Sequence, residues 1–195
     1  MDERLERWLA ALLTTPGLTS IRDPGEARRV HVDESLAALD AVQRFEGPIV
    51  DVGSGGGAPG IPLASALPDR DVTLLEANGR KCAFLREAAR EFSNVTVVQG
   101  RAEEQETDRF GVAVAKALAP PTVAAEWCLP LVAPGGAAVL YVGPSADASA
   151  VSQVSERLGG AAAEETPGLL VLRKLELTPA GFPRRPGVAK RRPLA

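Results

Sequence analysis

Apolar residues recur every three to four positions in two segments near the amino terminus, and this spacing predicts two helices. The first is expected at residues 2–14, where Thr14-Thr15-Pro16-Gly17 ends it. A loop containing Asp23-Pro24-Gly25 follows, and the second helix is expected at about residues 33–45. The apolar positions are Leu5, Trp8, Leu9, Leu12 and Leu13 in the first helix, and Leu36, Leu39, Val42 and Phe45 in the second.

The pattern changes at residue 48, where short apolar runs begin to alternate with helical segments. Strands are expected at residues 48–52, 72–75, 95–98, 111–115, 137–142 and 169–173. Helices are expected at residues 60–67, 79–91, 122–131 and 147–158. Strands that alternate with helices predict an α/β fold, in which helices cover both faces of a mostly parallel sheet. The expected architecture is a three-layer sandwich with a short helical extension at the amino terminus.

Length and composition agree with one globular domain. The chain has 195 residues, of which 45% are hydrophobic and 24% are charged. We expect a single domain over residues 1–195, made of amino-terminal helices (1–46), a core (47–176) and a basic tail (177–195). No apolar run approaches the ~20 residues of a membrane span. The acidic, amphipathic start is unlike a secretory signal, so a cytoplasmic protein without a membrane partner is expected.

The rare side chains exclude some chemistry. Two cysteines and one histidine do not supply the ligands of a zinc site, so no metal is expected, and Cys82 and Cys128 are predicted to be buried thiols. Trp8 and Trp127 lie on apolar helix stripes, which favours packing over stacking on bases. His31 has two open interpretations: a structural histidine bonded to a backbone carbonyl or Glu34, or a loop residue that faces RNA.

Charge is distributed unevenly along the chain. The last fourteen residues contain five basic residues and no acid, so they carry +5 and leave −8 on residues 1–181 of a chain whose net charge is −3. Such asymmetry favours a tail that binds nucleic acid, and a solvated end without a partner is the alternative. The candidate RNA-binding residues are Arg184, Arg185, Lys190, Arg191 and Arg192.

The stretch IVDVGSGGGAPGIPLA, residues 49–64, is the strongest local motif. A strand, a glycine-rich turn and a helix form the opening unit of a nucleotide-binding α/β fold, because glycines allow close approach of the backbone and the helix start offers unpaired N–H groups. Gly53-x-Gly55-x-x-Ala58 satisfies the dinucleotide fingerprint, and Glu76 lies 23 residues after Gly53, near the position of a ribose-binding acid. The motif alone does not separate dinucleotides from S-adenosylmethionine.

Asp51 favours S-adenosylmethionine. A carboxylate two residues before the first glycine repels a diphosphate but attracts a cofactor that has an ammonium and a sulfonium group. The alternative is a turn residue that caps the loop. Glu76 is expected to accept hydrogen bonds from the two ribose hydroxyls, or to be an exposed charge at a strand end. The loop at residues 99–103 is expected to face the adenine ring, with a solvated acidic loop as the alternative.

Several stretches together resemble the ribosomal RNA small subunit methyltransferase G family, which methylates guanine N7 in 16S ribosomal RNA. They follow the family's order and cover most of the chain. They are LTSIRDPGEARRVHVDESLAAL (18–39), IVDVGSGGGAPGIPLA (49–64), LLEANGRKCAFLRE (74–87), NVTVVQGRAEE (94–104), AVAKALAPP (113–121), LPLVAPGG (129–136) and LLVLRK…TPAGFPRRPGVAKRRPL (169–194). Motif I, Asp51-x-Gly53-x-Gly55-x-Gly57, is by itself common to class I methyltransferases.

The resemblance implies a class I, Rossmann-like fold, S-adenosylmethionine as the cofactor and the small ribosomal subunit as the partner. It places cofactor contacts on Gly53, Ala58, Ala102, Glu103 and Lys116. Three positions depart from the family's pattern: Lys116 replaces the usual arginine, Glu34 replaces aspartate, and Val142 replaces a frequent lysine. Lysine keeps the charge of arginine but loses its planar fork.

The implied reaction needs alignment more than proton transfer. Guanine N7 carries an in-plane lone pair and attacks the sulfonium methyl without a general base, provided that the base is single-stranded or flipped. Lys116 is the candidate for orienting the cofactor or the base. The competing functions are an NAD(P)-linked oxidoreductase, a methyltransferase for a small molecule or protein, and an inactive RNA-associated scaffold. No sequence feature requires an oligomer, so a monomer is expected.

Overall fold

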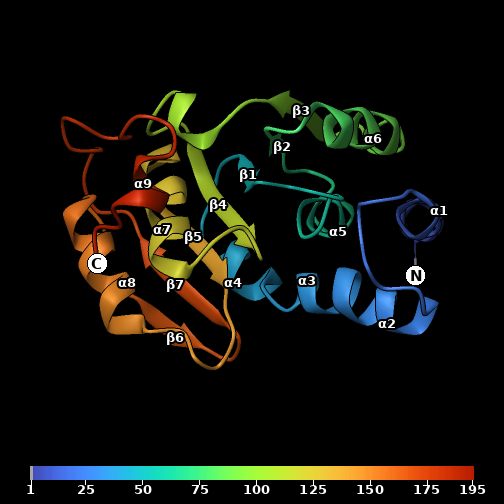
Figure 1. Ribbon diagram of the computed structural model, residues 1–195, viewed down its shortest axis with the longest axis horizontal. Coiled ribbons are helices and arrows are strands. Elements are labelled where there is room, and N and C mark those ends of the chain that lie inside the picture. The colour runs from blue at the N-terminus through green and yellow to red at the C-terminus, as the bar shows by residue number, and fades with distance from the viewer. Residues whose placement is uncertain (1) are drawn as a thin grey trace.

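The computed structural model describes residues 2–195 and is built on one seven-stranded sheet in the order β3-β2-β1-β4-β5-β7-β6 (Figure 1). The strands are β1 (Ile49–Val52), β2 (Val72–Glu76), β3 (Val95–Gln99), β4 (Phe110–Lys116), β5 (Val132–Tyr141), β6 (Glu164–Thr166) and β7 (Leu169–Arg173). The first five strands are parallel, whereas β7 pairs antiparallel with both β5 and β6. The expected α/β fold with a mostly parallel sheet is confirmed.

Helices cover the two faces of the sheet in two groups (Figure 1). On one face lie α1 (Glu3–Thr14), α2 (Pro24–Arg28), α3 (Glu34–Leu36), α4 (Leu39–Gln43), α5 (Gly60–Ala66) and α6 (Gly79–Ala89), and on the other α7 (Pro121–Cys128), α8 (Ala148–Arg157) and α9 (Val188–Arg191). Successive strand residues enter different cores: Ile49 packs with the first group and Val50 with the second. This alternation is the two-residue period of a strand buried on both faces.

The amino-terminal region is more helical than predicted. The expected loop at Asp23-Pro24-Gly25 is instead the start of α2, where the Asp23 side chain accepts a 2.7 Å hydrogen bond from the Glu26 N–H. An aspartate cap followed by proline is a helix-start signal, and this explains the difference. A π-helical turn at Arg29–Asp33 joins α2 to α3.

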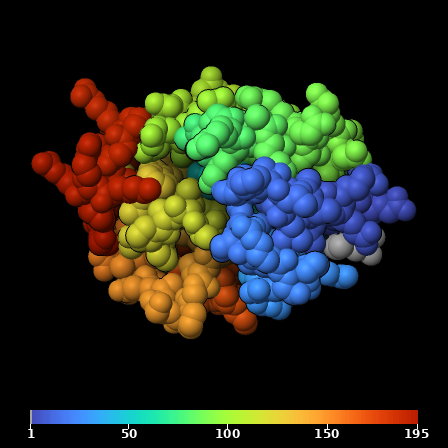
Figure 2. Space-filling model, turned by 45° about the vertical axis from the view of Figure 1, so that its right-hand side comes forward, coloured from blue at the N-terminus to red at the C-terminus, as the bar shows by residue number. Residues whose placement is uncertain are grey.

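The carboxyl-terminal part also departs from the prediction. The short edge strand β6 was not predicted, and the tail is folded onto α7 as α9, with Ala189 1% exposed. Short 3-10 turns follow β3, at Ala102–Glu104, and α7, at Leu129–Leu131. In the space-filling view the tail (red) packs against the yellow-green and yellow segments at one end of the molecule (Figure 2). The tail is therefore partly folded against the core, and its binding to nucleic acid stays a prediction.

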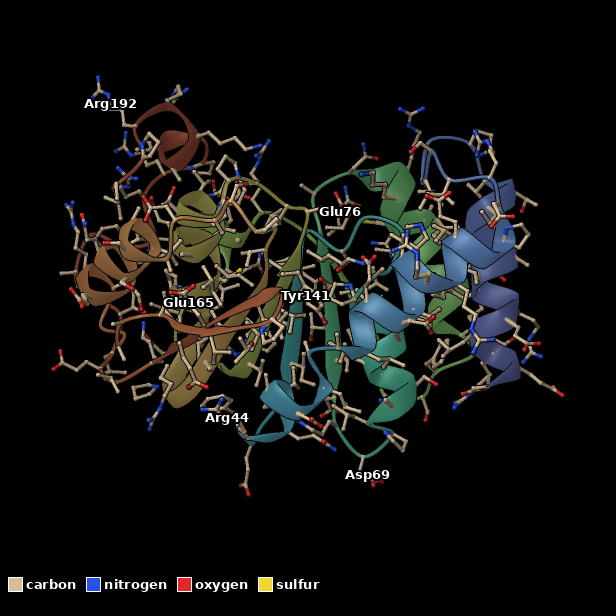
Figure 3. All side chains as sticks on the ribbon, turned by 90° about the horizontal axis from the view of Figure 1, so that it is seen from below. Arg44, Asp69, Glu76, Tyr141, Glu165 and Arg192 are labelled. Carbon is tan, nitrogen blue, oxygen red and sulfur yellow. The ribbon has the colours of Figure 1, made fainter. Side chains whose placement is uncertain are left out.

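The sheet order reverses between β1 and β4, and a ligand is expected at the carboxyl ends of these strands. Figure 3 shows Glu76, at the end of β2, at this edge of the sheet, and Asp69, which precedes β2, at the opposite edge. Within residues 2–195, no helix is both long and apolar enough to cross a membrane.

Candidate active site

The glycine-rich loop leaves β1 and is fixed from two sides. The Gly53 N–H donates to the Leu75 carbonyl at 2.8 Å, and the Trp8 indole N–H donates to the Gly56 carbonyl at 2.9 Å. Gly53 has a φ of +72°, and a Cβ there would lie 2.3 Å from Leu118 Cδ1. The turn therefore requires glycine at position 53 for both its backbone conformation and its close packing.

Asp51 lies beneath this loop and not in a cavity. Its side chain is buried, and its Oδ2 accepts a 3.0 Å hydrogen bond from the Gly60 N–H at the start of α5. Burial raises the pKa of Asp51 from 3.8 to about 7, against the lowering effect of the Gly60 hydrogen bond. Asp51 therefore bonds the backbone at the start of α5, and its expected contact with a cationic cofactor stays a prediction beside the alternative of a capping turn residue.

Glu76 holds the loop from the end of β2. Its Oε2 accepts from the Gly55 N–H at 2.9 Å and its Oε1 accepts from the Asn78 N–H at 2.7 Å. The residue is 8% exposed and lines a cavity at the strand ends. Because each carboxylate oxygen can accept more than one hydrogen bond, both oxygens retain capacity for hydroxyl groups.

Three cavities follow one another along the carboxyl edge of the sheet. The first, of about 280 Å³, is lined by Glu76, Ala102, Glu103, Trp127 and Lys190 among others. The second, of about 270 Å³, shares Gly53, Lys81 and Ala117 with the first. The third, of about 490 Å³, shares Lys116 and Ala117 with the second. The edge therefore offers adjoining spaces for a cofactor and a second reactant.

Most of the predicted cofactor residues line these spaces. Gly53, Glu76, Ala102 and Glu103 line the first cavity, and Gly53, Gly55, Ala58 and Lys116 line the second. Gly57 lines neither of the two. A Cβ at Gly57 would lie 2.6 Å from Ile61 Cδ1, so its small size serves helix packing.

Lys116 ends β4 at the junction of the second and third cavities. Its ammonium group donates to the Val30 carbonyl oxygen, in the π-helical turn, and lies 3.2 Å from Glu34 Oε2. The Lys116 side chain is 15% exposed, whereas the Glu34 side chain is 42% exposed, so only the ammonium side of the pair is shielded from water. Two of the three departures from the family's pattern, Lys116 and Glu34, are therefore direct partners.

His31 lies in the same turn and lines the second cavity. Its Nε2 is 3.1 Å from Thr19 Oγ1, so neither of the two expected partners holds the ring. Burial lowers the pKa of His31 below its ordinary value, and the charge of Lys116 lowers it further. The neutral imidazole is favoured at physiological pH.

The basic tail divides into docked and exposed residues. Arg184 forms two hydrogen bonds of 2.5 Å with the carboxylate of Glu126, whose side chain is 3% exposed. This ion pair gives Arg184 a structural partner, and its expected contact with RNA stays a prediction. Lys190 is exposed like Arg185, Arg191 and Arg192, and it also lines the first cavity.

Sequence reasoning missed several residues of the site. Trp127 was interpreted as core, and it is buried as predicted, but it also lines the first cavity. Lys81 lines the first two cavities, and Tyr141 lines the third. Each lies near a position that was identified: Lys81 comes five residues after Glu76, and Tyr141, which ends β5, precedes Val142. Proximity to strand ends was a signal that could have found them.

The first two cavities fit S-adenosylmethionine. The Glu76 carboxylate suits two ribose hydroxyls, Leu75 and Leu118 offer apolar surface to a purine, and the Gly53 turn lets the backbone approach a ligand. The glycine-rich loop, residues 53–60, contains no lysine, so it lacks the phosphate-binding lysine of a nucleoside triphosphate site.

Comparison with known proteins agrees with this geometry. The model of the GidB family, described as rRNA small subunit methyltransferase G, matches residues 2–161. The Ribosomal RNA small subunit methyltransferase G of Synechococcus elongatus is 39% identical, covering 91% of this chain and 82% of that protein. The protein of the same name from Salinispora arenicola is 42% identical, covering 80% and 70%.

Two solved structures share the fold at low sequence identity. The apo S-adenosylmethionine-dependent methyltransferase SibL has a TM-score of 0.65 at 15% identity, covering 86% of this chain and 62% of that one. A mutant of MtNAS in complex with S-adenosylmethionine has a TM-score of 0.57 at 16% identity, covering 89% and 73%. These likenesses confirm the Rossmann-like methyltransferase fold.

Proposed function

This chain belongs to the rRNA small subunit methyltransferase G family, and from that premise we propose that it transfers a methyl group from S-adenosylmethionine to N7 of a guanine in 16S rRNA. The observation that best supports this proposal is the row of three adjoining cavities. Glu76 lines the first cavity, and Lys116 lies where the second and third cavities meet. Family membership decides against an NAD(P)-linked oxidoreductase. We further propose that it works as a monomer, in the cytoplasm, where small ribosomal subunits are found.

The reaction requires little acid–base catalysis by the protein. When bound, S-adenosylmethionine supplies a methyl group on a positively charged sulfur. The guanine N7 lone pair forms the new C–N bond as the C–S bond breaks, no proton moves, and the positive charge passes from sulfur to the base. The protein has to hold the two reactants in line and exclude water, which is catalysis by orientation.

Each polar residue of the site has a place in that scheme. Glu76 fixes the ribose through its free lone pairs, while its bonds to the Gly55 and Asn78 N–H groups hold the loop. Lys116 positions the base by donating to it. A lone ammonium would oppose the positive charge that develops on the base, and the Glu34 carboxylate, 3.2 Å away, offsets it.

Methyl transfer from tritiated S-adenosylmethionine tests the proposal. We expect label in 16S rRNA of small subunits that lack the modification, and chain cleavage at one guanine after borohydride and aniline treatment, which reports N7-methylguanine. A panel of small molecules and proteins is the control. Label in that panel but not in rRNA would contradict the proposed substrate.

The exposed basic residues of the tail are proposed to contact phosphate groups of RNA. Replacing Arg185, Arg191 and Arg192 together by glutamine is expected to weaken RNA binding about tenfold at moderate salt and to lower the log–log salt slope by up to ~2. These three side chains are exposed, so the fold is expected to persist. An unchanged salt slope would contradict the contact.

A further inference from the structure

We propose that the tail segment, residues 182–191, and Trp127 form the wall of the cofactor cavity that holds the adenine ring, with the Trp127 indole N–H and Lys190 as contacts to it. The proposal rests on the proposed function, because it names further residues of the same cofactor site. It assigns to the binding of a small molecule two residues that sequence reasoning placed in the core and in RNA binding.

The tail segment is docked firmly enough to form a wall. Arg184 pairs with the buried Glu126 in α7, the residue before Trp127. Ala189 is 1% exposed, and Phe182 packs against the same core. The Gly187 N–H donates at 3.1 Å to Glu103 Oε1, so the tail also fixes another residue that lines the cavity.

Trp127 lines this cavity and carries an unused hydrogen-bond donor. The residue is 9% exposed, and its Nε1 is one of two buried side-chain nitrogen or oxygen atoms without a hydrogen-bond partner in residues 2–195. The Nε1 of Trp8, by contrast, donates to Gly56. Buried donors are almost always paired, so an unpaired indole N–H in a residue that lines a cavity indicates a ligand acceptor.

Lys190 offers a second contact, through its charge. Its Nζ lies 5.2 Å from the centroid of the Trp127 ring, and both residues line the first cavity. An adenine ring has nitrogen acceptors for the indole N–H and a π face for the ammonium group. The ribose site at Glu76 is in this cavity, whereas most of the glycine loop lines the second. This division places the adenine, rather than the methionine end, beside Trp127.

The Trp127→Phe variant tests the contact because it keeps an aromatic side chain and removes the indole N–H together with part of the ring system. Calorimetry with S-adenosylhomocysteine is expected to show binding about five- to tenfold weaker, the usual effect of one hydrogen bond. Adenosine is expected to lose affinity by the same factor. The melting temperature without ligand is expected to fall somewhat, because the smaller side chain leaves space in a buried position, so the affinity measured on the folded variant carries the test. A purely structural tryptophan would lower the melting temperature and spare ligand affinity.

Lys190→Gln and Arg192→Gln form a matched pair, since each removes one positive charge from the same segment and only Lys190 lines the cavity. S-adenosylhomocysteine affinity is expected to fall about threefold in the first and to stay unchanged in the second. Unchanged affinity in Trp127→Phe, or a loss for S-adenosylhomocysteine without a loss for adenosine, would overturn the inference. Absence of binding by the unaltered protein would instead overturn the proposed function.

Discussion

Methyl transfer to small ribosomal subunits is expected to fall about 100-fold when Lys116 is replaced by alanine, the effect of misplacing one reactant by about 1 Å. Affinity for S-adenosylhomocysteine is expected to change about threefold or less. Lys116 lines the second and third cavities but not the first, which contains Glu76 and the proposed adenine site. The loss should therefore appear in kcat for methyl transfer and not in cofactor affinity.

The expectation follows from how Lys116 is held. Its ammonium group has two fixed partners, the Val30 carbonyl and Glu34, so its position is defined before the base arrives. A positioned donor contributes more than a mobile one because no ordering is required in the transition state. Truncation also leaves the Glu34 carboxylate without its cavity partner, although Arg29 still bonds its Oε1 at 2.9 Å.

Three variants make the test specific. Lys116→Arg is expected to recover part of the rate, because it keeps the charge but is longer and forked. Glu34→Gln is expected to slow methyl transfer less than Lys116→Ala, by leaving the ammonium charge uncompensated. Arg109→Ala is the control, since that side chain is 63% exposed and its ion pair is with Glu106, three residues away. Full activity of Lys116→Ala on subunits would contradict the positioning role.

The strands of the core were predictable from the sequence because their apolar runs are buried on both faces. The strand predicted at residues 169–173 agrees with β7 at both ends. Strand β6 was missed because its residues are polar and largely exposed, so no apolar pattern indicates it. The start of α2 was predictable from Asp23 and Pro24, and the interpretation of these residues as a turn was the error.

The site was predictable where it depends on position at a strand end and not where it depends on long-range pairing. Glu76 and Lys116 end strands, so the fold class places them at the correct edge. The Arg184–Glu126 pair joins residues that are 58 positions apart, and local sequence does not indicate such a contact. Lys116 and Glu34 were likewise noted as separate departures, whereas the fold makes them one pair.

Asp51 was assigned from its charge, and its burial changes the expected effect of replacing it. The difference in unfolding free energy between Asp51→Asn and the unaltered protein is expected to increase with pH, in favour of the variant, from about pH 4 to about pH 7. The folded pKa of about 7 lies above the ordinary value of 3.8. The stability linked to Asp51 is therefore complete below about pH 4 and is lost as pH rises through 7.

The cause is the cost of a buried carboxylate. Desolvation is the largest contribution to the raised pKa, and the negative charge of Glu76 adds to it. The Gly60 N–H and Ser54 favour the ionised form but do not outweigh burial. Cys128 and Tyr141, whose own pKa values are raised by burial and by Asp51, stay neutral and offer no compensating charge. A tenfold change in proton affinity corresponds to about 1.4 kcal/mol. The rise in the pKa of Asp51 from 3.8 to about 7 therefore corresponds to a few kcal/mol of stability.

Urea unfolding of both proteins between pH 4 and 8 measures this difference, and subtraction cancels the titration of all other shared groups. The variant keeps an oxygen that can accept from the Gly60 N–H, so any effect of the new amide appears as a constant offset rather than a slope. The ratio of affinities for S-adenosylmethionine and S-adenosylhomocysteine separates the two interpretations of Asp51. It should be unchanged in the variant, because a capping group beneath the loop does not distinguish the charged sulfur from the neutral one. A flat pH difference, together with a selective loss of S-adenosylmethionine, would instead show that an ionised Asp51 faces the methyl donor.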